Sequence, residues 1–306
     1  MSRDFRARPM RPFFPCLAIL FVALVAGCGD APERVVTSNP PVADPSAIPN
    51  SPRLALVLSS GGPRGFAHIG VLKVLAEAGI RPDIIVGTSS GALVGVLFAA
   101  NPSATELEAA ALAIGGADVF DYDIFRRRVS GSAMQTWINN AIHDAPLDRL
   151  TMPVVVVATE RENGKPTAFT RGDAGAAVRA SSAIPGSYAP VEISGVVYID
   201  GDITAPVPIA VARSFGAKYV IAVDVAQNVT RAPAPPNAPQ SWTTEAIERR
   251  VKIEREAPLA DIVIEPPLPY ITGFNTDYRK MAIATGESAA RAALPKLKAL
   301  FGAPTR

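Results

Sequence analysis

The most informative part of the chain is Ile84-Ile85-Val86-Gly87-Thr88-Ser89-Ser90-Gly91-Ala92-Leu93. Its apolar start is typical of a strand buried on both faces, and the apolar pattern that follows it is typical of a helix. The Gly-x-Ser-x-Gly motif between them predicts a nucleophile elbow, a turn so tight that its flanking positions must be glycine. A glycine-rich strand–helix turn of a nucleotide-binding fold is the alternative. We expect Ser89 to be the nucleophile, held in the turn by Gly87, Thr88, Ser90 and Gly91.

Apolar runs alternate with helical patterns on both sides of this segment. The strands are expected at 54–58, 84–86, 154–157, 196–199, 219–223 and 262–264. The helices are expected at 66–78, 91–100, 104–114, 174–182, 207–215, 242–256 and 282–300. This alternation predicts an α/β fold of three α/β/α layers, in which helices cover both faces of a mostly parallel central sheet. Since no second linker divides residues 53–306, we expect them to form one domain.

Composition and charge exclude several classes of protein. The chain has 306 residues, of which 48% are hydrophobic and 19% charged, so it is neither disordered nor a coiled coil. Its two cysteines are too few for a disulfide scaffold or a four-cysteine zinc site. Four arginines against one aspartate give residues 1–27 a charge of +3, which leaves the rest of this +2 chain near −1. A near-neutral body argues against nucleic acid as a partner.

The first thirty residues predict an export signal. Arginines precede the apolar run at 13–26, which is shorter than the roughly 20 residues of a transmembrane helix and fits a secretory signal. The run leads into Val25-Ala26-Gly27-Cys28, which resembles the lipobox of bacterial lipoproteins. We therefore expect residues 1–27 to be a signal peptide, and Cys28 to be lipidated and to anchor the protein to a membrane of the bacterial cell envelope. A plain signal peptide and an uncleaved anchor helix are the alternatives.

The residues after Cys28 differ in composition from the rest of the chain. Residues 28–52 contain six prolines separated mostly by small and polar residues, a composition typical of an extended chain. We expect this segment to be an unpacked tether between the lipid anchor and the domain. Gly29 follows the cysteine in place of aspartate, which by resemblance to enterobacterial sorting favours the outer membrane.

A glycine-rich loop follows the first expected strand. It reads Ser59-Ser60-Gly61-Gly62-Pro63-Arg64-Gly65. Adjacent glycines allow backbone N–H groups to converge on an anion, and beside a serine nucleophile such a cradle would be an oxyanion hole. A phosphate-binding loop is the alternative, but the chain lacks Gly-Lys-Ser/Thr here and Pro63 removes one donor.

The general base is expected to be a carboxylate. The chain has two histidines, and neither lies late in the sequence, where the α/β-hydrolase order would place the base. His68 falls on an apolar helical stripe and is expected to be packed, whereas His143 is expected to be solvated. Asp200-Gly201-Asp202 directly follows the strand at 196–199, so Asp200 is well placed to reach the nucleophile. An ordinary strand-to-loop turn is the alternative for this motif.

Taken together, these motifs resemble those of the patatin-like phospholipases, in their compact bacterial form. The matching segments are Gly61–Gly65 running into 67–72, Gly87–Gly91, Arg179–Gly186, and Asp200-Gly201 leading to Pro206–Pro208. The resemblance covers roughly residues 53–300. It implies Ser89 as nucleophile, Asp200 as base, an oxyanion hole from the 61–65 loop, and hydrolysis of phospholipid or lysophospholipid acyl esters without a metal or other cofactor.

The chain departs from the family pattern at two positions. Ser60 stands where the family usually has glycine, and Asp202 stands where it has glycine or alanine. A second carboxylate would raise the pKa of Asp200 or would point to solvent. Arg64 matches the family's loop arginine, and we expect it to brace the loop.

Three further alternatives concern function and one helix. The chain is alternatively an esterase or thioesterase acting on other acyl compounds, or a membrane-tethered scaffold without activity. The helix expected at 242–256 is either a lid or membrane-contact helix, as Trp242 suggests, or a solvated surface helix. The sequence gives no indication of the oligomeric state.

Overall fold

The computed structural model describes residues 31–48, 51–270 and 272–301. The expected signal peptide and Cys28 lie outside these residues. Within them, no helix is long and apolar enough to cross a bilayer.

The strands form a central sheet and one separate hairpin. Those of the sheet are β1 (Glu33–Arg34), β2 (Leu54–Leu58), β3 (Ile84–Thr88), β6 (Val154–Glu160), β7 (Pro166–Phe169), β8 (Val191–Ile193), β9 (Val196–Ile199), β10 (Tyr219–Val223) and β11 (Ile262–Ile264). Their spatial order is β1-β8-β9-β6-β3-β2-β10-β11, with β7 paired to β6. The run from β6 to β11 is parallel, while β7 and β9 pair antiparallel with β6. The hairpin consists of β4 (Tyr122–Asp123) and β5 (Arg128–Val129).

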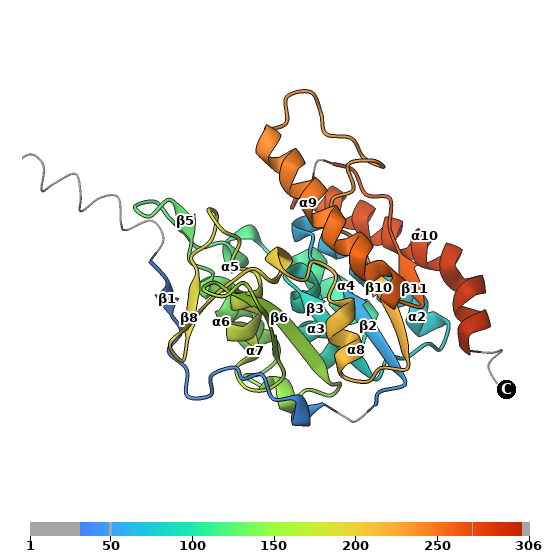
Figure 1. Ribbon diagram of the computed structural model, residues 1–306, viewed down its shortest axis with the longest axis horizontal. Helices are drawn as coiled ribbons and strands as arrows, with labels where there is room; N and C mark the ends of the chain where they lie inside the picture. Colours follow the sequence, from blue (N-terminus) through green and yellow to red (C-terminus); the bar gives the residue numbers. More distant parts are fainter. Residues whose placement is uncertain (1–30, 49–50, 271, 302–306) are drawn as a thin grey trace, which may run out of the picture.

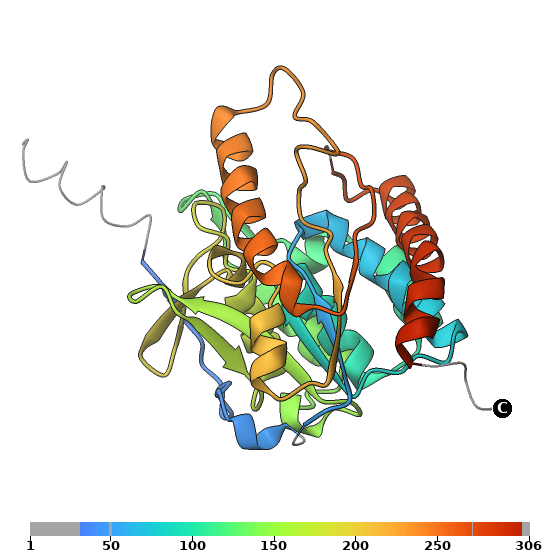
Figure 2. The same cartoon turned by 45° about the vertical axis from the view of Figure 1, so that its right-hand side comes forward.

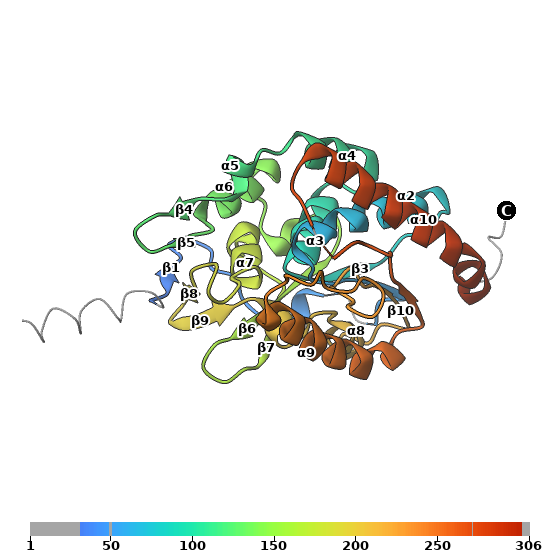
Figure 3. The ribbon, with the colours of Figure 1, turned by 90° about the horizontal axis from the view of Figure 1, so that it is seen from above.

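Helices cover both faces of this sheet (Figures 1 and 3). They are α2 (Phe66–Glu77), α3 (Ser90–Ala100), α4 (Ala104–Ala113), α5 (Gly116–Val119), α6 (Ser132–Ala141), α7 (Ala174–Ser181), α8 (Ile209–Ser214), α9 (Gln240–Glu256) and α10 (Thr276–Phe301). One core contains side chains of α2, α3, α4, α6, α7 and α10, and the other contains side chains of α8 and α9. The expected α/β/α fold with a mostly parallel sheet is confirmed.

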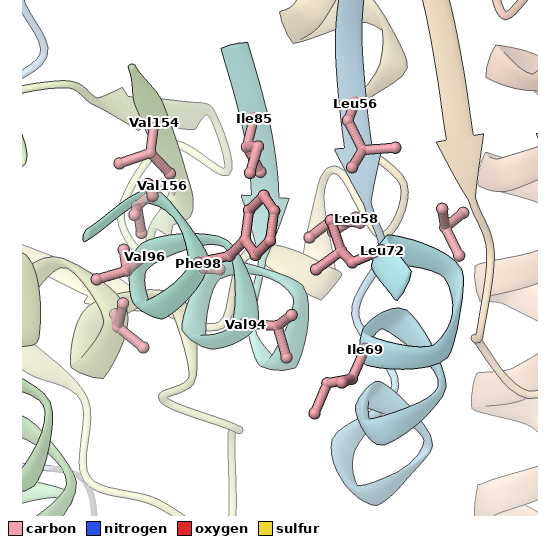
Figure 4. Packing of buried hydrophobic residues seen from close by; sticks show 14 of the residues in the cluster. Leu56, Leu58, Ile69, Leu72, Ile85, Val94, Val96, Phe98, Val154 and Val156 are labelled. Carbon is pink, nitrogen blue, oxygen red and sulfur yellow. The ribbon is translucent and has the colours of Figure 1, made fainter. Parts of the chain in front are cut away.

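The sheet separates the two cores because successive side chains of a strand point to opposite faces. Leu56 of β2 is in register with Ile85 of β3, which is in register with Val154 of β6, and all three belong to the first core. Figure 4 shows this row of side chains packed against α3 and α2. Their neighbours Val57 and Val86 are also in register and belong to the second core. Burial on both faces explains why these strands are continuous apolar runs.

Helices α2 and α10 pack closely against each other, and both contribute side chains to the first core (Figure 2). Gly70 of α2 lies against the backbone at Ile283, and Gly286 of α10 lies against the backbone at Ala67. A Cβ atom at either glycine would overlap a carbonyl oxygen of the other helix. Helix α10 begins at Thr276, six residues before the start expected from the sequence.

The prediction of an unpacked tether is wrong for residues 31–48. The segment is extended, but it pairs with the domain: β1 is parallel to β8, and the amide of Val42 donates to the carbonyl of Arg171 at 3.1 Å. Ile48 is buried in the second core. Proline-rich composition predicts an extended backbone, and such a backbone can also lie along a sheet edge whose hydrogen-bonding groups are free.

Candidate active site

Ser89 occupies a strained turn between β3 and α3. Its φ of 53° and ψ of −120° are unusual for a residue with a side chain and are typical of functional turns. The Ser89 amide donates to Ser181 Oγ at 2.8 Å, and Ser181 Oγ donates to the carbonyl of Val157 at 2.5 Å. The carbonyl of Ser89 accepts from the amide of Leu93 at 3.0 Å, which begins α3. These bonds at both sides of Ser89 hold the strained backbone in place.

The two glycines of the elbow are required by close approach of the backbone. A Cβ atom on Gly87 would lie 2.6 Å from the carbonyl oxygen of Gly91 and 2.7 Å from Ala92 Cα. A Cβ atom on Gly91 would overlap the carbonyl oxygen of Leu58, at the end of the neighbouring strand β2. The motif therefore allows α3 to start directly against the ends of β2 and β3.

Gly91→Ala is expected to destabilise the fold by about 3 kcal/mol, because the added methyl group meets backbone that cannot move aside. Chemical denaturation of the purified chain measures this change. Gly116→Ala is the matched control, since its Cβ atom would meet only Phe120 at 3.9 Å. Equal stability of the two variants would contradict the close packing of α3 against β2.

The glycine loop lies against the same helix start. A Cβ atom on Gly65 would be 2.6 Å from Ser90 Cβ, so the loop and α3 are in contact. The Ser60 amide donates to the carbonyl of Pro206 at 2.8 Å. The amides of Gly61 and Gly62 have no hydrogen-bond partner among the described residues, and both glycines line one cavity with Ser89. These two N–H groups thus have no partner within the described fold and belong to residues that share a cavity with Ser89.

Arg64 braces the loop from the outer side. Its Nη2 donates to Gln227 Oε1 and, at 2.5 Å, to the carbonyl of Tyr270. Burial lowers the pKa of the guanidinium from its ordinary value. Its hydrogen bonds thus tie the loop to two segments that lie far along the chain.

Asp200 lies beside Ser89. Ser89 Oγ donates to Asp200 Oδ2 at 2.9 Å, and both side chains are buried. Gly201 permits this approach, because a Cβ atom there would overlap the carbonyl oxygen of Val157. Burial, reinforced by the negative charge of Asp202, raises the pKa of Asp200 to about 8, although hydrogen bonds from the Asp202 amide and Ser89 oppose the shift. A carboxylate with a pKa in this range is a far better proton acceptor than an ordinary aspartate.

The two departures from the family pattern contact each other. Ser60 Oγ donates to Asp202 Oδ1, and Arg249 Nε of α9 donates to both carboxylate oxygens of Asp202 at 2.7 and 2.8 Å. The Asp202 carboxylate is thus occupied by the glycine loop and α9. Its backbone amide, in contrast, donates to Asp200 Oδ1 at 2.8 Å.

The histidines lie as expected from the sequence. His68 is fully buried, its Nε2 is 3.0 Å from the carbonyl oxygen of Ser59, and burial lowers its pKa to about 4. His143 is exposed. Neither histidine lines a cavity with Ser89.

Ser89 lies where two cavities of different character meet. The first, of about 200 Å³, is apolar and runs along α3 past Leu93 and Leu97 to side chains of α4 and α6. The second, of about 430 Å³, is lined by charged side chains and includes Asp200, Asp202 and part of α9. Residues Gly62, Pro63, Ser89 and Ile184 belong to both. An ester whose carbonyl carbon lies at Ser89 would have an apolar space on one side and a polar space on the other.

Comparison with known proteins assigns the family. The family model for patatin-like phospholipases matches residues 56–213, which include the glycine loop, Ser89 and Asp200. The chain belongs to the patatin-like phospholipase family. Over 207 residues, this patatin-like chain is 36% identical to an uncharacterised NTE family protein of Mycobacterium tuberculosis, a match that covers 66% of the chain and 57% of the relative. The chain thus spans little more than half of the length of that relative.

The chain is also similar to a human protein in sequence and to a solved bacterial structure in fold. Human patatin-like phospholipase domain-containing protein 6 is 35% identical over 182 residues, which cover 56% of this chain and 13% of that protein. The crystal structure of VipD from Legionella pneumophila matches with a TM-score of 0.55 at 13% identity, covering 80% of this chain and 67% of VipD. At that identity the likeness concerns the fold alone.

Two parts of the site are not predicted by the sequence. Ser181 lies in the Arg179–Gly186 motif, but nothing local indicates that its hydroxyl holds the Ser89 amide. The second part is the apolar cavity. Met134 and Trp137 have a spacing that puts both on one face of α6, and the spacing of Leu93 and Leu97 does the same on α3. Those spacings are equally typical of core residues, so they do not indicate a cavity.

Proposed function

We propose that the chain hydrolyses carboxylic esters of lipid acyl chains, with Ser89 as nucleophile and Asp200 as general base. The observation that carries the proposal is the 2.9 Å hydrogen bond from Ser89 Oγ to Asp200 Oδ2, at the meeting point of an apolar and a polar cavity. Family membership supports lipid as the substrate class. Fatty acid release from phospholipid vesicles by the purified chain tests the proposal, and release from neither vesicles nor short soluble esters contradicts it.

The proposed reaction has two halves. In the first, Asp200 accepts the Ser89 proton while Oγ bonds to the ester carbonyl carbon, and the amides of Gly61 and Gly62 donate to the resulting oxyanion. Collapse of this intermediate breaks the ester C–O bond, and the leaving alkoxide takes the proton from Asp200. In the second half, Asp200 accepts a proton from water, whose oxygen attacks the acyl-enzyme. The fatty acid leaves, and the proton returns to Ser89 Oγ.

The apolar cavity is proposed to hold the acyl chain. It starts at Ser89 and reaches Leu97, eight residues further along α3. Eight residues of helix span about 12 Å. An acyl chain of several carbons therefore fits along α3, with its ester carbonyl beside Ser89.

Leu97→Trp is expected to shorten the cavity and to shift the preference toward shorter acyl chains. Hydrolysis of long-chain esters should fall about tenfold relative to butyrate esters, because the larger ring occupies space needed by the chain end. A series of p-nitrophenyl esters of increasing acyl length measures the ratio. Leu97→Met, which keeps the side-chain volume, is the control. An unchanged length profile in a folded Leu97→Trp chain would place the acyl group elsewhere.

The expected lipid anchor is also retained as a proposal. We propose that Cys28 is lipidated and holds the enzyme at a membrane of the bacterial cell envelope, which brings it within reach of phospholipid substrates. Mass spectrometry of the N-terminal peptide from isolated membranes tests the modification, and an unmodified Cys28 there would exclude it.

A further inference from the structure

The β4–β5 hairpin carries exposed apolar and basic side chains at its tip. Phe125 is 92% exposed and Ile124 is 71% exposed, and Tyr122 beside them is also exposed. Arg126 and Arg127 follow directly in sequence and are exposed too. We call these five residues the hairpin tip. A cluster of aromatic and aliphatic side chains with this exposure is unusual on a protein surface in contact with water, and it indicates a binding surface.

The hairpin is held firmly at its base. The carboxylate of Asp121 accepts hydrogen bonds from the amides of Gly131 at 2.7 Å and Ala133 at 3.0 Å. Asp123 Oδ1 accepts from the amides of Phe125 and Arg126, which shapes the turn. The tip is therefore presented outward by a structured turn.

The base of the hairpin adjoins the apolar cavity. Phe120, two residues before Tyr122, lines the cavity and packs edge-on against Phe274 with 5.2 Å between ring centroids. On the other strand, Val129 donates its amide to the carbonyl of Ser187, and the next residue, Tyr188, also lines the cavity. The base of the hairpin therefore adjoins the apolar cavity that includes Ser89.

The N-terminal segment is fastened to the same hairpin. Arg128 Nη2 donates to the carbonyl of Ala31 at 2.6 Å, and Glu33 accepts from Ser130 Oγ at 2.6 Å and from Arg126 Nη1 at 3.2 Å. Figures 1 and 3 show the hairpin beside β1 at one end of the molecule. Cys28 precedes Ala31 by three residues, which span at most about 11 Å. A lipid on Cys28 would therefore bring the hairpin to the membrane surface.

We propose that the hairpin tip inserts into the headgroup region of a phospholipid bilayer and presents the apolar cavity to the lipid from which the acyl chain enters. Aromatic side chains favour this interface, and the exposed guanidinium of Arg127 suits lipid phosphates. The inference rests on the proposed function for the identity of the substrate, but the docking surface is argued from the hairpin itself. It assigns membrane contact to the hairpin and not to α9.

Helix α9 offers the matched comparison. Its exposed apolar residues Ile247 and Val251 are 50% and 53% exposed, but acidic and basic residues surround them in sequence. The charged face of α9 lines the polar cavity through Glu248, Arg249 and Lys252. Ile247 and Val251 are thus exposed apolar residues that, according to the proposal, do not contact the membrane. Replacing them is the control for replacing Ile124 and Phe125.

The kinetic test compares two double variants of the full chain. Ile124→Asp with Phe125→Asp should lower hydrolysis of phosphatidylethanolamine–phosphatidylglycerol vesicles at least about tenfold, because membrane affinity scales with inserted apolar area. Hydrolysis of soluble p-nitrophenyl butyrate should stay within about twofold, since neither residue lines the cavity. Ile247→Asp with Val251→Asp should stay within about twofold on both substrates. Equal loss on both substrates in the hairpin variant, or vesicle-specific loss in the α9 variant, overturns the proposal.

A second test is independent of turnover. The test measures tryptophan fluorescence in two variants that both carry Ser89→Ala. The first also carries Phe125→Trp and Trp242→Phe, and the second retains Phe125 and Trp242. Vesicles of phospholipid with brominated acyl chains should quench the tryptophan fluorescence of the first chain more strongly. Trp137 is common to both chains, so the difference in quenching compares a tryptophan at position 125 with one at position 242. Stronger quenching of the second chain, or none in either, overturns the proposal. Quenching at position 125 in an enzyme whose wild type hydrolyses no ester would support docking while contradicting the proposed function.

Discussion

Ser89→Ala is expected to lower ester hydrolysis by at least about 10⁴-fold, because it removes the atom that forms the acyl-enzyme. Labelling with an alkyl fluorophosphonate should also be lost. Peptide mass analysis of the wild type should find the adduct on Ser89, whose hydroxyl is hydrogen-bonded to Asp200 and lies where the two cavities meet. Initial rates on a short soluble ester, measured beside the labelling, separate loss of chemistry from loss of membrane contact.

Ser214→Ala is the control for the Ser89 experiment. Ser214 is an exposed serine at the end of α8, where its hydroxyl donates to the carbonyl of Val211. This variant should be labelled and should turn over ester like the wild type. An adduct on a residue other than Ser89 would exclude Ser89 as nucleophile. A folded wild type that takes no label, even with vesicles present, would favour the alternative that the chain is a membrane-tethered scaffold without activity.

The sequence predicts the parallel part of the sheet, out to the edge strand at 262–264, better than the opposite edge. The strands at 54–58 and 219–223 have the expected bounds, because burial on both faces makes each a continuous apolar run. β1 and β8, with two and three residues, form that opposite edge and leave little pattern in the sequence. β1 in particular falls in a proline-rich segment whose pairing depends on a partner about 160 residues away.

In the site, too, the sequence predicts the local features and misses the contacts between distant residues. Ser89, Asp200 and the glycine loop lie in motifs whose local turn geometry demands glycine, and the sequence therefore indicates them directly. The ion pair between Asp202 and Arg249 joins residues 47 positions apart, and the Ser60 bond to Asp202 spans 142. The sequence shows Ser60 and Asp202 as two separate departures from the family pattern, and only the fold reveals that they are hydrogen-bonded partners.

Asp200→Asn is expected to lower ester hydrolysis by about 10²–10⁴-fold, because the amide cannot accept the Ser89 proton. In the wild type the rate should rise with pH and level off above about 8, since Asp200 must be ionised to act and its pKa is raised to about 8. Asp202→Asn is the matched control. It should retain most activity and move the rise to lower pH, because removing the neighbouring negative charge lowers the pKa of Asp200. A wild-type rate that is flat through this range would contradict the assigned base.

Stability measurements separate the chemical effect of Asp200→Asn from unfolding. Folding raises the pKa of Asp200 from 3.8 to about 8, so the folded state favours the protonated carboxyl. The free energy of unfolding therefore decreases as pH rises from about 4 to about 8, because the unfolded chain releases this proton first. The side chain introduced by Asp200→Asn does not ionise, so the variant does not lose this part of the free energy of unfolding as pH rises. The inactive variant should accordingly melt at a higher temperature than the wild type at about pH 9, and at a similar temperature near pH 4. A variant that is inactive and also less stable at about pH 9 would instead assign Asp200 a structural role.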